Sequence, residues 1–226
     1  EQQSSEEDTW TAVIRPANGM RKVRTYSWQG RLEDFIWDGL DSRGNRVRDG
    51  FYRYQVSSTD FAGNTTSFTI NNIRSDSRDT SILITPEYRG FSPNGDGNRD
   101  TLILRVFAAV NEGIKEWSLK LNGENYDDEE IIKGFDSLPE RFFWDGSIDS
   151  EFVAEGEYEL ELLVSYEKGN ISVTTTEEPI VVDLTPPQFV GKADNLWFSP
   201  EGDSLKDFLK VYQESSEESY WEGRII

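Results

Sequence analysis

Hydrophobic and polar residues alternate along several short stretches of the chain. The clearest stretch is residues 157–164, where every second residue is apolar and three glutamates lie between them. The residues of the apolar face are Tyr158, Leu160, Leu162 and Val164. A period of two is typical of a β-strand that buries one face. Residues 51–56 alternate in the same way, and residues 101–107 predict a strand with apolar side chains on both faces.

Turn-forming residues separate these stretches. Gly, Asn and Asp gather at residues 41–45, 62–64 and 122–125, and such clusters mark the turns between strands. Short strands at fairly regular spacing, joined by turns of this kind, are typical of an antiparallel β-sandwich or barrel. We therefore expect an all-β fold.

The chain contains an internal repeat. Trp-Asp-Gly at residues 37–39 recurs at residues 144–146, which is 107 positions later. Phe-Ser-Pro followed by Gly-Asp, at residues 91–96, recurs at residues 198–203 with the same spacing. Two motifs that recur with the same spacing indicate a duplicated module of about 107 residues.

A third feature recurs with the same spacing of 107 positions. Trp10 and Trp117 each open an alternating apolar run, again 107 positions apart. The Gly-x-Tyr sequences at residues 50–52 and 156–158 are 106 positions apart, so the second copy has lost one residue before this point. Loops between strands tolerate such a loss.

The repeat divides the chain into three parts. Residues 80–187 make one complete module, residues 1–79 a module without its first strands, and residues 188–226 the opening strands of a third. We place the last boundary at Asp-Leu-Thr-Pro-Pro, residues 183–187. Two successive prolines remove two backbone donors and stiffen the junction.

Both ends of the chain fall at the same phase of the repeat. Residues 213–221 resemble residues 2–10 at an offset of 211, which hints at a two-unit superperiod. One interpretation is that the chain is an excerpt of a longer array, because a module divided through its sheet exposes unpaired strand edges. The alternative is that residues 188–226 supply the missing strands to residues 1–78, within the chain or between chains.

Composition narrows the class of protein. The chain has 226 residues, a hydrophobic fraction of 35% and an aromatic fraction of 13%, so its core depends on large rings, which suit pleated sheets. The net charge of −20 argues against binding to DNA or RNA, since that affinity comes mostly from Lys and Arg. We find neither an apolar run long enough to cross a membrane nor a signal peptide.

The absence of two residue types restricts the chemistry. The chain has no Cys and no His, which excludes disulfides, thiolate catalysis, cysteine-based zinc sites and the commonest general base. An enzyme of this composition would work with carboxylates, Ser, Lys or Tyr alone. We therefore expect a protein without catalytic activity.

The order of the motifs resembles two related bacterial families. Residues 91–100, then 144–146, then 156–158 follow the pattern of the immunoglobulin-like domain of the flagellar hook-capping protein and of the gliding-motility-associated C-terminal domain. The resemblance covers nearly the whole chain. It implies tandem antiparallel β-sandwich (immunoglobulin-like) modules and an extracytoplasmic location in the periplasm, at the cell surface or secreted.

One loop has the composition of a possible calcium site. Asn94, Asp96, Asn98 and Asp100 place side-chain oxygens at every second position around two glycines, and hard cations prefer such ligands. The competing interpretation is that these side chains accept hydrogen bonds from the turn's own backbone. The third copy favours the turn, because Leu205 stands where a third oxygen is expected. We expect no other cofactor.

Four other features have structural interpretations. We expect the Trp ring of Trp-Asp-Gly in the core, its Asp on turn amides and its Gly at the bend. The acidic run 127–130 is expected to be a solvated loop. The glutamates of residues 157–161 lie on the solvated face and have no counterparts in the first copy, which argues against acid–base catalysis. Trp28 and Trp197 are expected to pack as buried corners rather than to stack on sugars.

These features favour a structural, spacer or adhesive protein built from neighbouring modules of a longer chain, with a protein or glycan partner of unknown identity. The alternatives are a carbohydrate-binding accessory module of a secreted protein and a hook-cap-like assembly scaffold. Each has its own test: an elongated shape in solution, binding to a glycan, or self-association.

Overall fold

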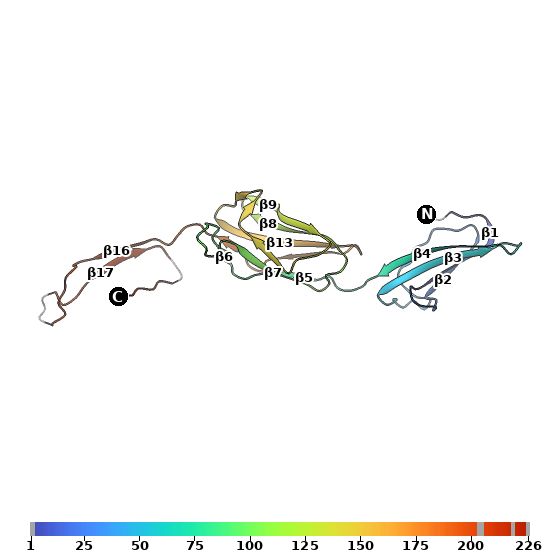
Figure 1. Ribbon diagram of the computed structural model, residues 1–226, viewed down its shortest axis with the longest axis horizontal. Coiled ribbons are helices and arrows are strands. Elements are labelled where there is room, and N and C mark those ends of the chain that lie inside the picture. The colour runs from blue at the N-terminus through green and yellow to red at the C-terminus, as the bar shows by residue number, and fades with distance from the viewer. Residues whose placement is uncertain (1–2, 203–205, 218–219, 225–226) are drawn as a thin grey trace.

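The computed structural model describes residues 3–202, 206–217 and 220–224. Its described residues form strands, turns and bends, and none of them lies in a helix that could cross a membrane. The strands gather in three groups that follow one another along the chain (Figure 1). The expectation of an all-β protein is confirmed.

The first group is a single antiparallel sheet. Its strands are β1 (Glu7–Pro16), β2 (Arg24–Gly30), β3 (Gly50–Thr59) and β4 (Thr65–Ser75). They lie side by side in the order β2-β1-β3-β4. One face of β1 and β3 carries the buried residues Trp10, Ala12, Ile14, Tyr52, Tyr54 and Val56. The segment at residues 32–37 crosses this face and packs Leu32, Phe35 and Trp37 against it.

The second group is a β-sandwich of the immunoglobulin type. One sheet has the order β10-β7-β5, and its strands are β5 (Ile82–Pro86), β7 (Leu102–Ala108) and β10 (Arg141–Trp144). The other sheet has the order β6-β15-β13-β8-β9, with β14 also paired to β13. Its strands are β6 (Gly90–Phe91), β8 (Ile114–Gly123), β9 (Tyr126–Phe135), β13 (Gly156–Tyr166), β14 (Ile171–Thr175) and β15 (Ile180–Val182). A short hairpin, β11 (Ser147–Ile148) and β12 (Glu151–Phe152), follows β10.

The alternating pattern of β13 explains why the two sheets pack together. All four apolar residues that the pattern predicts are buried between them. They meet Leu102 and Leu104 of the other sheet in one continuous core. Burying such side chains stabilises a domain by about 1.5–3 kcal/mol each, so the sandwich gains stability that a single sheet does not reach.

The third group is a hairpin of β16 (Phe189–Ala193) and β17 (Val211–Ser215). Each strand lies 107 positions beyond residues of β5 and β7, and the register repeats as well. Ile82 pairs with Ala108 in the sandwich, and Phe189 pairs with Ser215 in the hairpin. The described residues contain no sheet that faces this hairpin.

Three expectations about local structure are wrong. The acidic run 127–130 lies within β9, not in a loop. Glu129 and Glu130 pair with β8, Asp127 and Asp128 lie at an irregularity of the same strand pair, and all four side chains are exposed at the edge of the sheet.

Trp197 is exposed rather than buried, and no second sheet follows the β16–β17 hairpin among the described residues. Trp28 lies within β2, opposite Trp10, and is half-buried rather than a buried corner. Its ring does pack near those of Tyr26 and Phe35.

Candidate functional site

Two sequence motifs meet at one end of the sandwich. The rings of Phe91 and Trp144 lie 5.3 Å apart between their centroids. Beside them Gly146 has a φ of 80°, and a β-carbon there would approach the Pro93 Cγ to 2.8 Å. Only glycine fits both the backbone angle and the space. Phe-Ser-Pro and Trp-Asp-Gly are therefore two halves of one packing unit.

The acidic loop directs most of its side-chain oxygens at its own backbone. Asp100 accepts hydrogen bonds from the amides of Gly95 and Gly97, both at 2.7 Å. Asn94 Oδ1 accepts one from the amide of Asp96 at 3.0 Å, and Asp96 Oδ1 accepts one from the amide of Asn98 at 2.7 Å. These bonds satisfy the amides of a turn in which Gly95 and Gly97 have positive φ.

The described ends of the equivalent loop in the third copy make matching hydrogen bonds. Gly202 donates its amide to Asp207 Oδ1 at 3.0 Å, and Ser199 donates to the Lys206 carbonyl at 3.0 Å. The sandwich has the matching bond from Ser92 to Arg99, also at 3.0 Å. Asp203 and Leu205 lie outside the described residues. The hydrogen bonds that close the loop are thus common to two copies that differ in sequence, with Asn94 of the sandwich replaced by Glu201.

The described residues offer little for a metal ion. No group of three or more Asp or Glu side chains among them is placed to hold one. Calcium at Asn94, Asp96, Asn98 and Asp100 stays a prediction, because amide oxygens of Asn add to the two carboxylates there.

The two Trp-Asp-Gly sequences adopt the same turn. Trp144 Nε1 donates to the Ser147 carbonyl at 2.9 Å, and Trp37 Nε1 donates to the Leu40 carbonyl at 3.0 Å. Asp145 accepts the amide of Ser147 at 3.0 Å. A hydrogen bond from the Ser147 side chain holds the pKa of Asp145 below its usual range. The structural interpretation of this motif is confirmed.

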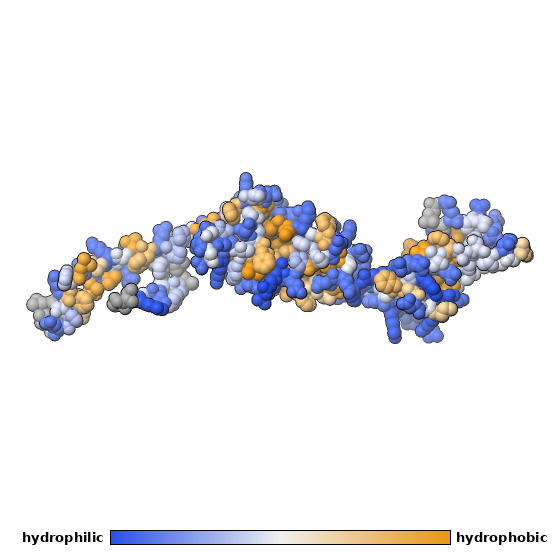
Figure 2. All heavy atoms as spheres, in the orientation of Figure 1, coloured by the Kyte–Doolittle hydropathy of each residue, from blue (hydrophilic) through white to orange (hydrophobic). Residues whose placement is uncertain are grey.

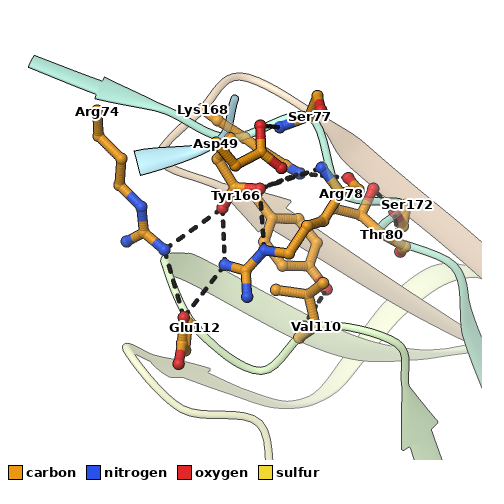
Figure 3. Close-up of polar contacts among 11 residues, drawn as sticks. Asp49, Arg74, Ser77, Arg78, Thr80, Val110, Glu112, Tyr166, Lys168 and Ser172 are labelled. Atoms are coloured by element: carbon orange, nitrogen blue, oxygen red, sulfur yellow. Dashed lines mark hydrogen bonds and ion pairs between the residues drawn. The ribbon is translucent and has the colours of Figure 1, made fainter. Parts of the chain in front are cut away.

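A polar cluster joins the first sheet to the sandwich (Figure 3). At its centre Asp76, whose side chain is 8% exposed, accepts two hydrogen bonds from Arg78 at 2.7 and 3.0 Å. Arg74, at the end of β4, approaches the same carboxylate at 3.3 Å. Lys168, in the turn after β13, approaches it at 3.5 Å. Lys168 thus reaches a carboxylate that is 92 positions away in the sequence.

Residues 76–80 form the linker between the first sheet and the sandwich. Further contacts hold this linker to the sandwich. Glu112 of the sandwich bridges Arg74 and Arg78 at 3.4 and 3.1 Å. The Lys168 ammonium donates to the Arg78 carbonyl at 2.5 Å, and the Ser172 hydroxyl to the Thr80 carbonyl at 2.6 Å.

On the other side of the linker, the amide of Ser77 donates to Asp49 of the first module at 2.8 Å (Figure 3). The linker therefore has polar partners in both modules.

Electrostatics favour the charged form of this cluster. Hydrogen bonds from Arg78 hold the pKa of Asp76 well below its usual range, and the nearby Lys168 acts in the same direction. The same bonds raise the pKa of Arg78. An ionised carboxylate with several cationic donors is a strong, directional contact.

The junction after the sandwich repeats part of this arrangement. Asp183 accepts the amide of Thr185 at 3.0 Å, as Asp76 accepts the amide of Arg78 at 3.1 Å. Glu155 accepts the amide of Leu184 at 2.6 Å, as Asp49 accepts that of Ser77. The turn is common to both junctions, whereas the cluster of Arg and Lys belongs to the first.

Sequence reasoning missed the junction cluster. One signal was available, because Asp76 and Asp183 are 107 positions apart and follow the register of the repeat. No local pattern indicates Lys168 or Glu112, which reach the linker only through the fold.

Comparisons with known proteins give no family. No protein-family model matches the chain, and no curated protein matches it. Among solved structures, it is similar to a tetra-tandem repeat in the extending region of a large adhesion protein, with 13% identity, a TM-score of 0.40, and coverage of 93% of this chain and 49% of that chain. It is also similar to a Ca²⁺-stabilized adhesin of an Antarctic bacterium, with 20% identity, a TM-score of 0.33, and coverage of 84% and 44%.

The chain thus spans about half the length of these solved structures. Both similarities are too weak to carry a function from one protein to the other.

Proposed function

We propose that this chain is a non-catalytic segment of an extracytoplasmic tandem-repeat protein, in which immunoglobulin-like modules act as a stiff spacer. The main support is the junction between the first sheet and the sandwich, where hydrogen bonds hold the linker to both modules. A spacer transmits distance only when its modules keep their relative orientation, and the linker at residues 76–80 has partners on both sides.

Charge and composition are consistent with exposure to an aqueous environment outside the cytoplasm. A net charge of −20 keeps such a segment soluble and repels nonspecific anionic contacts. The motif resemblance to bacterial surface and secreted domains supports the same location. Protease treatment of intact source cells tests it: removal of the segment from the cell surface or medium is expected, and protection inside spheroplasts contradicts it.

The spacer role is tested by the width of an inter-module distance. The chain has no Cys, so two exposed positions, Thr66 and Glu124, take nitroxide labels through Cys substitutions without side reactions. Electron–electron double resonance is expected to give one narrow distance distribution between the first sheet and the sandwich. A broad distribution contradicts a stiff spacer.

A second candidate is binding of a protein or glycan on the outer face of the three-stranded sheet. Exposed Leu83 lies there opposite exposed Phe107, and half-buried Ile103 lies opposite exposed Phe143. Aromatic side chains exposed on a flat sheet are a common platform for ligands. A glycan array with the wild type and a Phe107→Ser, Phe143→Ser variant tests it, and equal signals from both proteins contradict it.

A further inference from the structure

The outer face of the three-stranded sheet carries a pair of arginines. The strands β5, β7 and β10 contain only two charged residues, Arg105 and Arg141, in a chain with 43 acidic and 23 basic residues. Both are exposed, and their neighbours Leu104 and Phe142 point the other way into the core. The outer face of the opposite sheet instead carries the glutamates of β13. The two outer faces of the sandwich therefore differ in charge.

The two arginines lie directly opposite each other. The register of β7 and β10 places Arg105 across from Arg141, and opposed residues of antiparallel strands are about 4.5–5.5 Å apart between their Cα atoms. Like charges in such positions destabilise a sheet. The pair therefore does not serve the stability of the sandwich, whereas an anion bound between the two side chains would neutralise both charges.

Both guanidinium groups keep donors that a ligand can use. Arg105 Nε donates to Glu87 Oε1 at 2.9 Å, and its two Nη groups have no partner among the described residues. Arg141 makes neither a side-chain hydrogen bond nor a salt bridge within the described part of the chain. A guanidinium presents its N–H donors in a planar fork that matches a carboxylate. The pair is therefore equipped to hold a carboxylate.

Phenylalanine rings flank the arginines on both sides. Phe107 and Phe143 each lie two residues from the arginine of their own strand, in opposite directions along the sheet. Their side chains are 62% and 66% exposed, and they are about 13 Å apart along the strands at 3.3 Å per residue. Figure 2 shows hydrophobic residues at the surface of the sandwich in the region where Figure 1 places β5 and β7. The face thus presents an aromatic ring, a cationic pair and a second aromatic ring in order.

This order of side chains fits a sugar chain that carries carboxylates. Sugar rings have apolar C–H faces that pack on exposed aromatic rings, and a carboxylate accepts paired hydrogen bonds from a guanidinium. The central strand β7 is paired on both sides, with β5 and β10, so the face offers side chains and no free backbone groups there. A peptide strand binds largely through backbone hydrogen bonds at the edge of a sheet. The face therefore favours an acidic polysaccharide over an acidic peptide.

We propose that this face binds an anionic polysaccharide whose sugars carry carboxylates, with Arg105 and Arg141 on a carboxylate and Phe107 and Phe143 on the neighbouring sugar rings. The proposal rests on the second candidate function, binding on this face, and adds the chemical class of the ligand. Glu87 is a positioning residue, because its bond to Nε orients the Arg105 guanidinium. The acidic face of the other sheet opposes binding little, since packed sheets are about 10 Å apart and exposed charges are largely screened beyond about 8 Å at physiological ionic strength.

Polygalacturonate and its fully methyl-esterified form test the charge of the ligand. The two polymers share one backbone, but the ester has no carboxylates. Calorimetric titration is done with the full chain in excess chelator, which removes calcium bridges between the polymer and acidic loops. The chain is expected to bind polygalacturonate about tenfold or more tightly than the ester, because only the acid accepts charge-assisted hydrogen bonds. Added salt is expected to weaken this binding.

Variants of Arg141 test the site itself. Arg141→Gln is expected to weaken binding of polygalacturonate about tenfold or more, and Arg141→Lys to weaken it less, since Lys keeps the charge but lacks the fork. Lys115→Gln is the matched control, because it removes the same charge from an exposed position of β8 on the other sheet, and it is expected to bind like the wild type. The melting temperature of Arg141→Gln is expected to stay the same or rise, because the variant relieves a like-charge pair.

Several outcomes overturn the proposal. Equal binding of the two polymers rejects the carboxylate as the ligand but keeps the face as a glycan site. No binding of either polymer also overturns it, and the glycan array with the Phe107→Ser, Phe143→Ser variant then decides separately whether the face binds any glycan. Equal losses from Arg141→Gln and Lys115→Gln would show that net charge alone matters. Tighter binding of poly-L-glutamate or dextran sulfate, or self-association that Arg141→Gln abolishes, would assign the face to another partner.

Discussion

Gly146 lies so close to Pro93 that a β-carbon at residue 146 would come within 2.8 Å of the Pro93 Cγ. Gly39, its counterpart one repeat earlier, has a similar backbone angle and open space around it. Replacing a glycine of this kind by a larger residue has two destabilising effects, the strain of a positive φ and the steric clash with neighbours. At Gly146 both effects occur, whereas at Gly39 only the strain does.

The pair of glycines gives a matched test. Gly39→Ala adds only backbone strain, which costs about 1–2 kcal/mol. Gly146→Ala adds the clash with Pro93 as well, so its loss of unfolding free energy is expected to exceed that of Gly39→Ala by about 1–3 kcal/mol, as for overpacking in a core. Urea unfolding measures the loss, and hydrogen exchange assigns it to a module. Equal losses would show that Pro93 moves aside freely.

Removal of Asp76 is expected to loosen the junction between the first sheet and the sandwich. Asp76→Ala removes the common acceptor of Arg74, Arg78 and Lys168, and hydrogen bonds to charged groups contribute about 1.5–3 kcal/mol. With labels at Thr66→Cys and Glu124→Cys, the inter-module distance distribution is expected to broaden.

Asp183→Ala is the control for this change. Asp183 has the same turn bond to an amide but lies at the junction beyond the sandwich. The distance between the first two modules is expected to stay narrow in this variant. Broadening of equal size in both variants would contradict a specific role of the Asp76 cluster.

Acid is expected to loosen the same junction. The pKa of Asp76 in the folded chain is lowered by the hydrogen bonds from Arg78. A carboxyl whose pKa is lowered on folding stabilises the fold fully above its unfolded pKa of about 3.9, and this contribution is lost as the pH falls through the lower folded pKa. The inter-module distance is therefore expected to stay narrow at pH 5–7 and to broaden progressively below about pH 4. Asp76→Asn removes the titration, so its distance distribution is expected to respond less to acid.

The acidic loop is expected to depend on Asp100 more than on Asp96. Asp100 accepts two backbone amides and Asp96 Oδ1 accepts one, and loss of a turn or cap acceptor costs about 0.5–2 kcal/mol. Thermal unfolding of Asp100→Ala and Asp96→Ala in excess chelator measures the two losses. A larger loss for Asp96→Ala would contradict the backbone role of Asp100.

Calcium at the same loop has its own test. If the four predicted oxygen donors hold the ion, titration of chelator-stripped protein gives binding heat and raises the melting temperature, and Asp100→Ala abolishes both effects. If the side chains serve only the turn, calcium gives no heat, and Asp100→Ala lowers the melting temperature equally with and without the ion.

The sequence by itself determined the repeat and the most regular strands. The alternation in residues 157–164 predicted the buried face of β13 correctly, since a strand directs successive side chains to opposite faces wherever it lies. The turn role of Trp-Asp-Gly was also readable, because Asp145 accepts the amide of Ser147 only two residues later and Gly146, with its positive φ, lies between them. Turn contacts between residues close in sequence therefore recur wherever the motif recurs.

Tertiary structure alone decided which parts meet. Lys168 and Asp76 are 92 positions apart, and no local pattern brings an ammonium group to a carboxylate over that separation. The acidic run at residues 127–130 was taken for a loop because its charges suggest solvent, whereas Glu129 and Glu130 pair with β8 and still leave their side chains exposed. Trp197 was expected to be buried, yet burial requires a facing sheet. The alternation of apolar and polar residues follows from the geometry of a single strand, so the sequence shows it. Contacts between distant residues depend on which sheets and loops pack together, which only the tertiary structure shows.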